Sequence, residues 1–223
     1  MVDLWFVEAG KYDVLPLDDR SVAELVKVQP EALIPPSGTW KYYPGTIELP
    51  EFSAANTRGR SYKILAQVDL DEDAKGVIFA QGARFGGHTL FVKDRKLYYV
   101  YNFLGIPPEQ VLVSDVEVGT GAHILGMEFV KEGIGPRHET NGTARLYVDD
   151  AVVAEAPMKT QPGHFALCGE GLTIGRDSSD PVSAEYSAGF DFSGGTIREV
   201  EVNVADDVYL DAEREFAAAL ARD

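Results

Sequence analysis

The histidines and the single cysteine are the residues best suited to bind a metal or to attack a substrate. None of the four histidines has the His-x-His or His-Glu-x-x-His spacing that places two imidazoles on one metal ion; they are His88, His123, His138 and His164. Cys168 stands between a leucine and a glycine, where a cysteine is typically a small core residue. A Glu-x-Asp-x-x-Glu run, which would place paired carboxylates on one strand face, does not occur. These residue types therefore predict no catalytic centre.

A calcium site is one interpretation of the loop that begins at Arg176. Asp177 and Asp180 stand close together there with two serine hydroxyls between them. Hard oxygen donors in a loop are the ligands that Ca²⁺ prefers. The alternative is a turn in which the aspartates hydrogen-bond to their own backbone, with Asp180 placed before a proline.

A second candidate site is an aromatic cluster that could bind a ligand. Tyrosines, a histidine, an arginine and an asparagine gather along one predicted hairpin, and the candidate ligand-binding residues are Arg84, His88, Tyr99, Tyr101 and Asn102. One face of this hairpin must belong to the core. The other face could stack on a sugar ring or pack against another domain.

The elements that position these residues are antiparallel strands. Residues 76–102 form three of them in a row: a short apolar run, a glycine-rich bend, and two alternating strands that meet at Asp94-Arg95. Alternation with a period of two and many aromatic residues indicates half-buried strands. A three-stranded meander cannot bury both of its faces, so other strands must form an opposing sheet. The sequence thus predicts an all-β, two-sheet antiparallel β-sandwich.

Further alternating stretches supply the remaining strands. We expect them at 61–70, 110–118, 122–130, 143–149, 151–156, 164–168, 171–176 and 196–204. In the last one Ile197 is out of phase with the valines that follow, which predicts a β-bulge near Arg198. The acidic residues that follow Leu70 are interpreted as a solvated turn, and so is Asn141-Gly142-Thr143, although it matches a glycosylation sequon.

The two ends of the chain have a different pattern. Ser21 to Glu24 form a capping box that predicts a short N-terminal helix, and prolines exclude regular structure from 29–45. An alanine-rich stretch at 211–222 predicts a C-terminal helix. The expected organisation is therefore a leading segment with an extended linker at 1–45, a sandwich at 46–205 and a helix at 206–223.

Composition limits the partners. The formal net charge is −16, which repels phosphate backbones and anionic lipid, so we expect no nucleic-acid and no membrane partner. No apolar run approaches the ~20 residues of a membrane span, and no secretory leader is recognised. With a single cysteine, the chain cannot form an internal disulfide and does not point to an oxidising compartment.

The order of the strand motifs resembles a known fold. Gly87 to Val92, Lys96 to Asn102, Ala144 to Asp149, Leu172 to Gly175 and Phe192 to Val200 follow one another as in the laminin G-like, concanavalin A-like jelly roll. The chain departs from that family at the hairpin turns, which have Asp94-Arg95 and Asp149-Asp150 in place of Asp-Gly or Asn-Gly. The resemblance implies a jelly-roll sandwich.

A second resemblance covers nearly the whole chain. The opening from Leu4 to Arg20 is similar to the end of the sulfatase region in long bacterial arylsulfatases, and the blocks 58–66 and 161–163 are similar to the sandwich that follows it there. This implies the C-terminal module of an arylsulfatase-like sulfuric ester hydrolase, with the sulfatase catalytic domain as its partner and self-association if that partner is missing. The alternative is an independent carbohydrate-binding module.

The catalytic motif of that family is missing. Sulfatases need a Cys/Ser-x-Pro-x-Arg motif and a divalent metal held by Asp and Asn side chains. Cys168 has neither the proline nor the arginine, and the Ser179-x-Pro181 stretch ends in Ser183 where arginine is required. We therefore predict that the chain is not an enzyme on its own.

Overall fold

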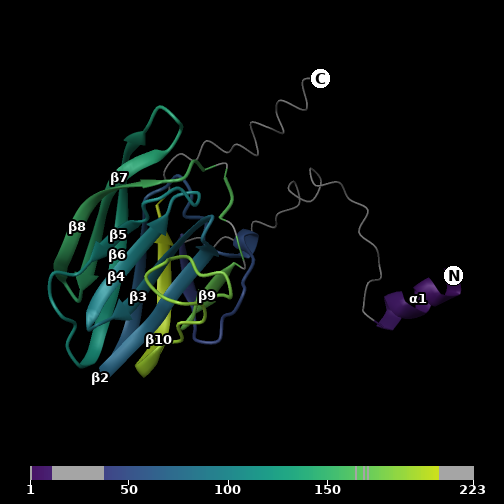
Figure 1. Cartoon of the computed structure of the whole chain (residues 1–223), viewed down its shortest axis with the longest axis horizontal. Coiled ribbons are helices and arrows are strands. Elements are labelled where there is room, and N and C mark those ends of the chain that lie inside the picture. Colours follow the sequence, from purple (N-terminus) through teal and green to yellow (C-terminus); the bar gives the residue numbers. More distant parts are fainter. Residues whose placement is uncertain (1, 12–37, 164, 168, 170, 206–223) are drawn as a thin grey trace. The chain divides into compact units, whose positions relative to one another are not determined.

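The computed structural model describes residues 2–11, 38–163, 165–167, 169 and 171–205, and its contacts divide the chain into two units. In the unit of residues 1–33 and 213–223, the described element is helix α1, Val2–Lys11. The unit of residues 34–212 contains the strands (Figure 1). They are β1 Thr39–Tyr42, β2 Tyr62–Ala83, β3 Gly86–Lys93, β4 Lys96–Asn102, β5 Gln110–Val113, β6 Gly121–Ile134, β7 Thr140–Val148, β8 Ala151–Thr160, β9 Leu172–Ile174 and β10 Ser193–Val204, with one 3-10 turn, η2 Glu51–Ser53.

The strands form two antiparallel sheets that share β2. Sheet A has the order β1-β10-β2-β6-β7-β8, and sheet B has β5-β4-β3-β2 with β9 also paired to β2. Strand β2 pairs with β6 as far as Leu70 and with β3 from Gly76 onward. The predicted two-sheet antiparallel sandwich is confirmed.

The acidic stretch after Leu70 is part of β2 and not a turn, which corrects the sequence interpretation. Asp71, Glu72 and Asp73 are exposed where β2 passes from one sheet to the other. Strand β2 can stay extended here because only its pairing partner changes, from β6 to β3, and its own backbone does not have to turn. Charged side chains fit there because the crossing point is open to solvent.

The main core lies between the sheets and follows the predicted alternation. Tyr62, Ile64, Ala66, Val68 and Leu70 all point into it from β2. The same face of β6 contributes Leu125, Met127 and Phe129, and that of β10 contributes Val200, Val202 and Val204. Burying one such large side chain stabilises the fold by about 1.5–3 kcal/mol.

Both predicted hairpin turns are present. Asp94 and Arg95 have φ values of 50° and 60°, and Asp149 has a φ of 54°. Two consecutive positive φ values match the twist of the flanking strands, which is why tight β-hairpins favour this geometry. The β3–β4 turn therefore has the geometry that Asn-Gly usually supplies, without a glycine.

The predicted bulge is also confirmed. The register between β10 and β2 slips between Ile197, which is opposite Val68, and Glu199, which is opposite Gln67. Arg198 is the extra residue, so it and Glu199 both face away from the core. A bulge of this kind changes the direction of a side chain.

Four further local predictions are wrong. Strand β1 lies within 29–45, where no regular structure was expected, because its backbone pairs with the free edge of β10. Residues 165–167 form no strand, and Asn141 to Thr143 lie inside β7. Strand β5 also ends at Val113, well before residue 118.

The helix predictions have different outcomes. Helix α1, Val2–Lys11, is present where the sequence predicted no helix. Both the stretch at Ser21 and the helix expected at 211–222 lie outside the described residues. Among the helices that the structure describes, none is long and apolar enough to cross a membrane.

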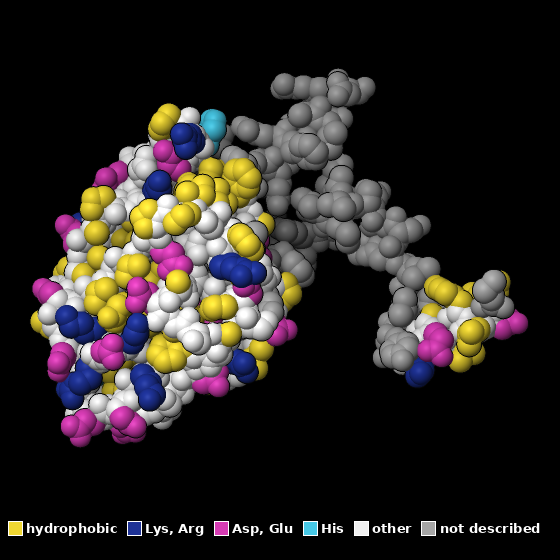
Figure 2. All heavy atoms as spheres, viewed as in Figure 1, with side chains coloured by type: hydrophobic (Ala, Val, Ile, Leu, Met, Phe, Trp, Pro, Cys, Tyr) yellow, Lys and Arg dark blue, Asp and Glu magenta, His cyan; other side chains and the backbone are white. Residues whose placement is uncertain are grey.

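A loop covers the outer face of sheet B. This strap, residues 175–192, is closed at its base by a hydrogen bond from Phe192 N to Gly175 O of 2.8 Å. Val182 on the strap packs with Val77, Phe91 and Val100 to form a second, smaller apolar cluster. On the face of the sandwich that Figure 2 shows, basic and acidic side chains are interspersed. The strap thus makes sheet B a layer with apolar contacts on both faces.

Candidate functional site

The predicted aromatic site belongs to the core. His88 and Tyr99 are fully buried, and Tyr101 and Asn102 are only 4% exposed. These four side chains cannot contact a ligand at the surface, which corrects the expectation for them. The reason is the alternation along β3 and β4, which turns His88, Tyr99 and Tyr101 toward the opposing sheet, whereas Asn102 lies on the other face, beneath the strap.

The buried polar groups satisfy one another. The hydroxyls of Tyr62 and Tyr99 are 2.7 Å apart, and the Tyr99 hydroxyl lies 3.0 Å from His88 Nδ1. On the other side of the ring, His88 Nε2 lies 3.2 Å from Gln81 Oε1. Burial lowers the pKa of His88 to about 3 and raises the pKa of Tyr99 well above its ordinary value. All these groups are neutral, as a dry interior requires.

Asn102 ties the strap to the sandwich. Its Nδ2 donates to Val182 O at 2.9 Å, and its Oδ1 accepts from Gly105 N at 3.0 Å. Arg84, in contrast, is exposed; it pairs with Asp180 at 3.0 Å and lies over the Phe85 ring. Of the five predicted ligand-binding residues, only Arg84 reaches solvent.

The two aspartates predicted to bind calcium each have partners within the protein. Asp177 is buried, and its carboxylate accepts from Ser178 N at 2.7 Å, from Val182 N at 2.9 Å and from the Tyr186 hydroxyl. Asp180 is engaged by Arg84. In the described part of the chain no group of three His, Cys, Asp or Glu could hold a metal. The geometry is that of an aspartate that organises a turn.

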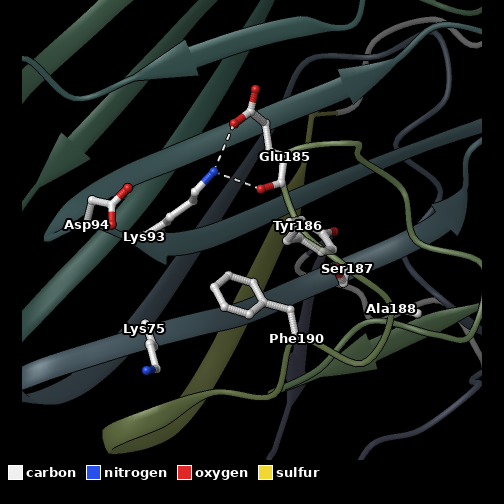
Figure 3. Close-up of a pocket in the computed structure, with 8 residues that line it drawn as sticks. All are labelled: Lys75, Lys93, Asp94, Glu185, Tyr186, Ser187, Ala188 and Phe190. Carbon is white, nitrogen blue, oxygen red and sulfur yellow. Dashed lines mark hydrogen bonds and ion pairs between the residues drawn. The ribbon is translucent and has the colours of Figure 1, made fainter.

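A hollow of about 410 Å³ opens where the strap meets the β3–β4 turn (Figure 3). One wall comes from β2, β3 and the β3–β4 turn, and the other comes from the strap. Its lining residues are Lys75, Lys93, Asp94, Glu185, Tyr186, Ser187, Ala188 and Phe190.

The aromatic wall of the hollow is held firmly. The rings of Tyr186 and Phe190 stack with centroids 5.4 Å apart, and Phe91 packs edge-on against both. The Tyr186 hydroxyl bonds to the buried Asp177, so this ring is anchored from below. Burial, and then the Asp177 charge, raise the pKa of Tyr186 far above its ordinary value. This phenol stays protonated and donates its hydrogen bond inward.

Some of the charged groups that line the hollow have hydrogen-bonding partners and others have none. Lys93 Nζ lies 2.8 Å from Glu185 O and 3.2 Å from Glu185 Oε2, which fastens the strap to β3. Lys75 and Asp94 form no side-chain hydrogen bond or ion pair with any residue that the structure describes (Figure 3). A donor and an acceptor therefore remain available beside the aromatic wall.

A row of charged side chains crosses β2, β6, β7 and β8 on the open face of sheet A, and the charges in this row are paired. Glu128 forms an ion pair with Lys63 at 3.1 Å and accepts a hydrogen bond from the Tyr147 hydroxyl at 2.8 Å. Arg145 forms an ion pair with Glu155 at 2.5 Å. Partial burial opposes ionisation of Glu128, but the hydrogen bonds from Tyr147 and Lys63 outweigh it and lower its pKa. The charged groups of this row pair with one another and leave little for a ligand, so the hollow beneath the strap is the better candidate site.

Sequence reasoning missed the hollow. Its two walls come from residues around 75–94 and around 185–190, which only the fold brings together. One signal was present: Tyr186 and Phe190 are aromatic residues in a polar, glycine-containing loop. Such residues need a packing surface, and here it is the outer face of sheet B.

Comparison with known proteins identifies the fold. No family model and no curated protein matches the chain. The CBM40 of the Ruminococcus gnavus IT-sialidase, solved with α2,3-sialyllactose, superposes with a TM-score of 0.50 at 11% identity, over 78% of this chain and 92% of that one. The chain has the jelly-roll fold. Laminin G domains LG4-5 of the mouse laminin α1 chain (TM-score 0.45, 11% identity, 78% and 42% covered) and a Caenorhabditis elegans galectin (0.41, 12%, 76% and 99%) are also similar.

The fold expectation is therefore confirmed, while the arylsulfatase origin gains no support from these comparisons. At these identities the likeness concerns the fold alone. What the jelly roll does in this chain has to be argued from its own surface.

Proposed function

We propose that this chain is a non-catalytic carbohydrate-binding module and that the hollow beneath the strap holds the sugar. The observation that carries the proposal is the pair of unengaged groups, Lys75 and Asp94, beside the aromatic wall of Phe190 and Tyr186. A binding site needs an apolar surface with a few convergent polar groups, and this hollow has both.

A sugar ring has the matching chemistry. One face of a pyranose carries C–H groups that pack on an aromatic side chain, and its edge carries hydroxyls that both donate and accept. Lys75 can donate to such a hydroxyl and Asp94 can accept from another. The fold is shared with a CBM40 whose structure contains sialyllactose, which supports a saccharide as the ligand class.

The hollow favours binding over hydrolysis. Its lining has no histidine and no cysteine, and of its two carboxylates Glu185 is held by Lys93. Glycoside hydrolysis requires two carboxyl groups with separate roles. We therefore expect binding without turnover.

A glycan array followed by titration calorimetry tests the proposal. We expect at least one glycan to bind, and Phe190→Ala and Lys75→Ala each to weaken it about tenfold, the cost of one stacking contact or one charged hydrogen bond. Phe85→Ala and Lys96→Ala are matched controls, because they remove the same residue types outside the hollow. Glycan binding that is unchanged in both hollow variants would refute this site.

A second candidate function rests on helix α1. Its side chains Val2, Leu4, Trp5, Phe6 and Val7 are 44% to 68% exposed, an unusual density of large apolar groups. They favour packing against a partner domain, which in the arylsulfatase interpretation is the catalytic domain of a longer parent. Light scattering and an apolar-surface dye test this: a monomer that binds no dye, and does not change on Trp5→Ser, would contradict it.

A further inference from the structure

The bulge at Arg198 has a consequence for the outer face of sheet A. It places a guanidinium next to Gln67, at the end of the sheet where β2, β6 and β10 run together. A second hollow of about 280 Å³ opens there. Its lining residues are Gln67, Val68, Ala122, His123, Ile124, Asp149 and Arg198.

The wall opposite Arg198 is rigid. Asp149, in the left-handed turn between β7 and β8, accepts from Ile124 N at 2.9 Å and lies 3.0 Å from His123 Nδ1. The hydrogen bond from Ile124 and then that from His123 lower the pKa of Asp149. The carboxylate is therefore ionised at neutral pH and fixed in direction.

Arg198 and Gln67 retain hydrogen-bonding capacity. The sole ion pair of Arg198 among described residues is to Asp69 at 3.6 Å, between side chains that are 63% and 49% exposed. Such a pair contributes little and leaves most guanidinium donors open. Gln67 donates from Nε2 to Glu199 at 3.0 Å, and its Oε1 has no partner in the described part of the chain.

The floor of this hollow is apolar. Ile124 is 45% exposed, although its backbone lies in the middle of sheet A, and Ala122 beside it is exposed as well. An exposed isoleucine within a ring of polar groups gives a ligand an apolar contact, while Arg198 and Gln67 give it a donor and an acceptor.

We infer that this hollow is a second saccharide-binding site, selective for a neutral sugar, so that the module binds at two separate places. A neutral ligand fits because the lining has one carboxylate, Asp149, and one guanidinium, Arg198, which already pairs with Asp69, so no excess positive charge is left for an anion. The inference extends the proposed function, yet it uses none of the residues of the hollow beneath the strap.

Backbone amide NMR can follow the two sites independently. The probes are lactose, maltose and cellobiose as neutral sugars, with 3′-sialyllactose as the acidic counterpart. With a neutral disaccharide at millimolar concentration, we expect shifts at Ile124, Asp149 and Arg198 that saturate separately from those at Ser187 and Ala188. Arg198→Ala should weaken the first set about tenfold and leave the second unchanged.

The controls separate this inference from the proposed function. Arg137→Ala, at an exposed arginine in the β6–β7 connection, should change neither set of shifts. Phe190→Ala should weaken only the second set, by about tenfold. No shift at Ile124, Asp149 and Arg198 with any of the three neutral sugars, or a stronger response there to 3′-sialyllactose, overturns the inference. If the unaltered chain shows the first set of shifts but none at Ser187 and Ala188, only the proposed function is contradicted.

Discussion

Two polar regions lie near opposite ends of strand β3, and their roles differ because of what surrounds them. At His88 the imidazole is fully buried, and both ring nitrogens have partners. Near Lys93, at the other end of the strand, Lys75 and Asp94 face a solvent-accessible hollow without partners among described residues. Polar groups that satisfy one another stabilise a fold, whereas open ones are available to a ligand. The two regions should therefore respond in opposite ways to mutation.

The largest effect is expected at His88. His88→Ala leaves a cavity and removes the partners of Tyr99 and Gln81, so we expect a loss of about 3–5 kcal/mol in the free energy of unfolding. Urea denaturation followed by tryptophan fluorescence or circular dichroism measures it. A loss of less than about 1 kcal/mol would contradict the idea that the buried hydrogen-bond network around His88 stabilises the fold.

Asp177 should come next. Asp177→Ala removes the acceptor of Ser178 N, Val182 N and Tyr186, so we expect a loss of about 2–3 kcal/mol from unpaired buried donors. The loss should be the same with Ca²⁺ and with a chelator. A melting temperature of the unaltered chain that rises with Ca²⁺, but not in Asp177→Ala, would instead support the calcium interpretation.

The pH dependence of stability sharpens the comparison. The folded pKa of His88 is about 3, below the unfolded value of about 6.5, so the unfolded chain binds more protons between these values. Stability should fall by up to about 1.4 kcal/mol per pH unit as pH drops from 6.5 toward 4.5. Glu128 and Asp149, whose pKa values are lowered, add losses only nearer pH 4. His88→Gln should flatten the first window; an unchanged slope would contradict the assignment to His88.

The smallest effect on stability is expected in the hollow. Lys75→Ala removes an exposed side chain without a partner in the described structure, so the free energy of unfolding should change by less than about 0.5 kcal/mol. Glycan affinity should nevertheless fall about tenfold. If Lys75→Ala lowered both the free energy of unfolding and the glycan affinity, Lys75 would have a structural role like that of His88, and the contrast between the two regions would not hold.

Local patterns in the sequence were enough to predict much of the sandwich. The alternation from Tyr62 to Leu70 and from Val200 to Val204 identifies core-facing positions, and a one-residue phase slip identifies the bulge at Arg198. Such features depend on neighbouring residues along one strand, and the period of two is a property of the extended backbone. They can therefore be predicted without knowing what lies across the sheet.

The tertiary structure alone decided which polar residues are dry and which are open. His88 and Lys75 lie on strands of the same sheet, yet one faces the opposing sheet and the other faces the strap. The strap itself is placed by Asn102 and Lys93, whose contacts with Val182 and Glu185 join residues far apart in the chain. The exposure of a side chain depends on what packs against it from elsewhere in the chain. No periodicity along a single strand contains that information.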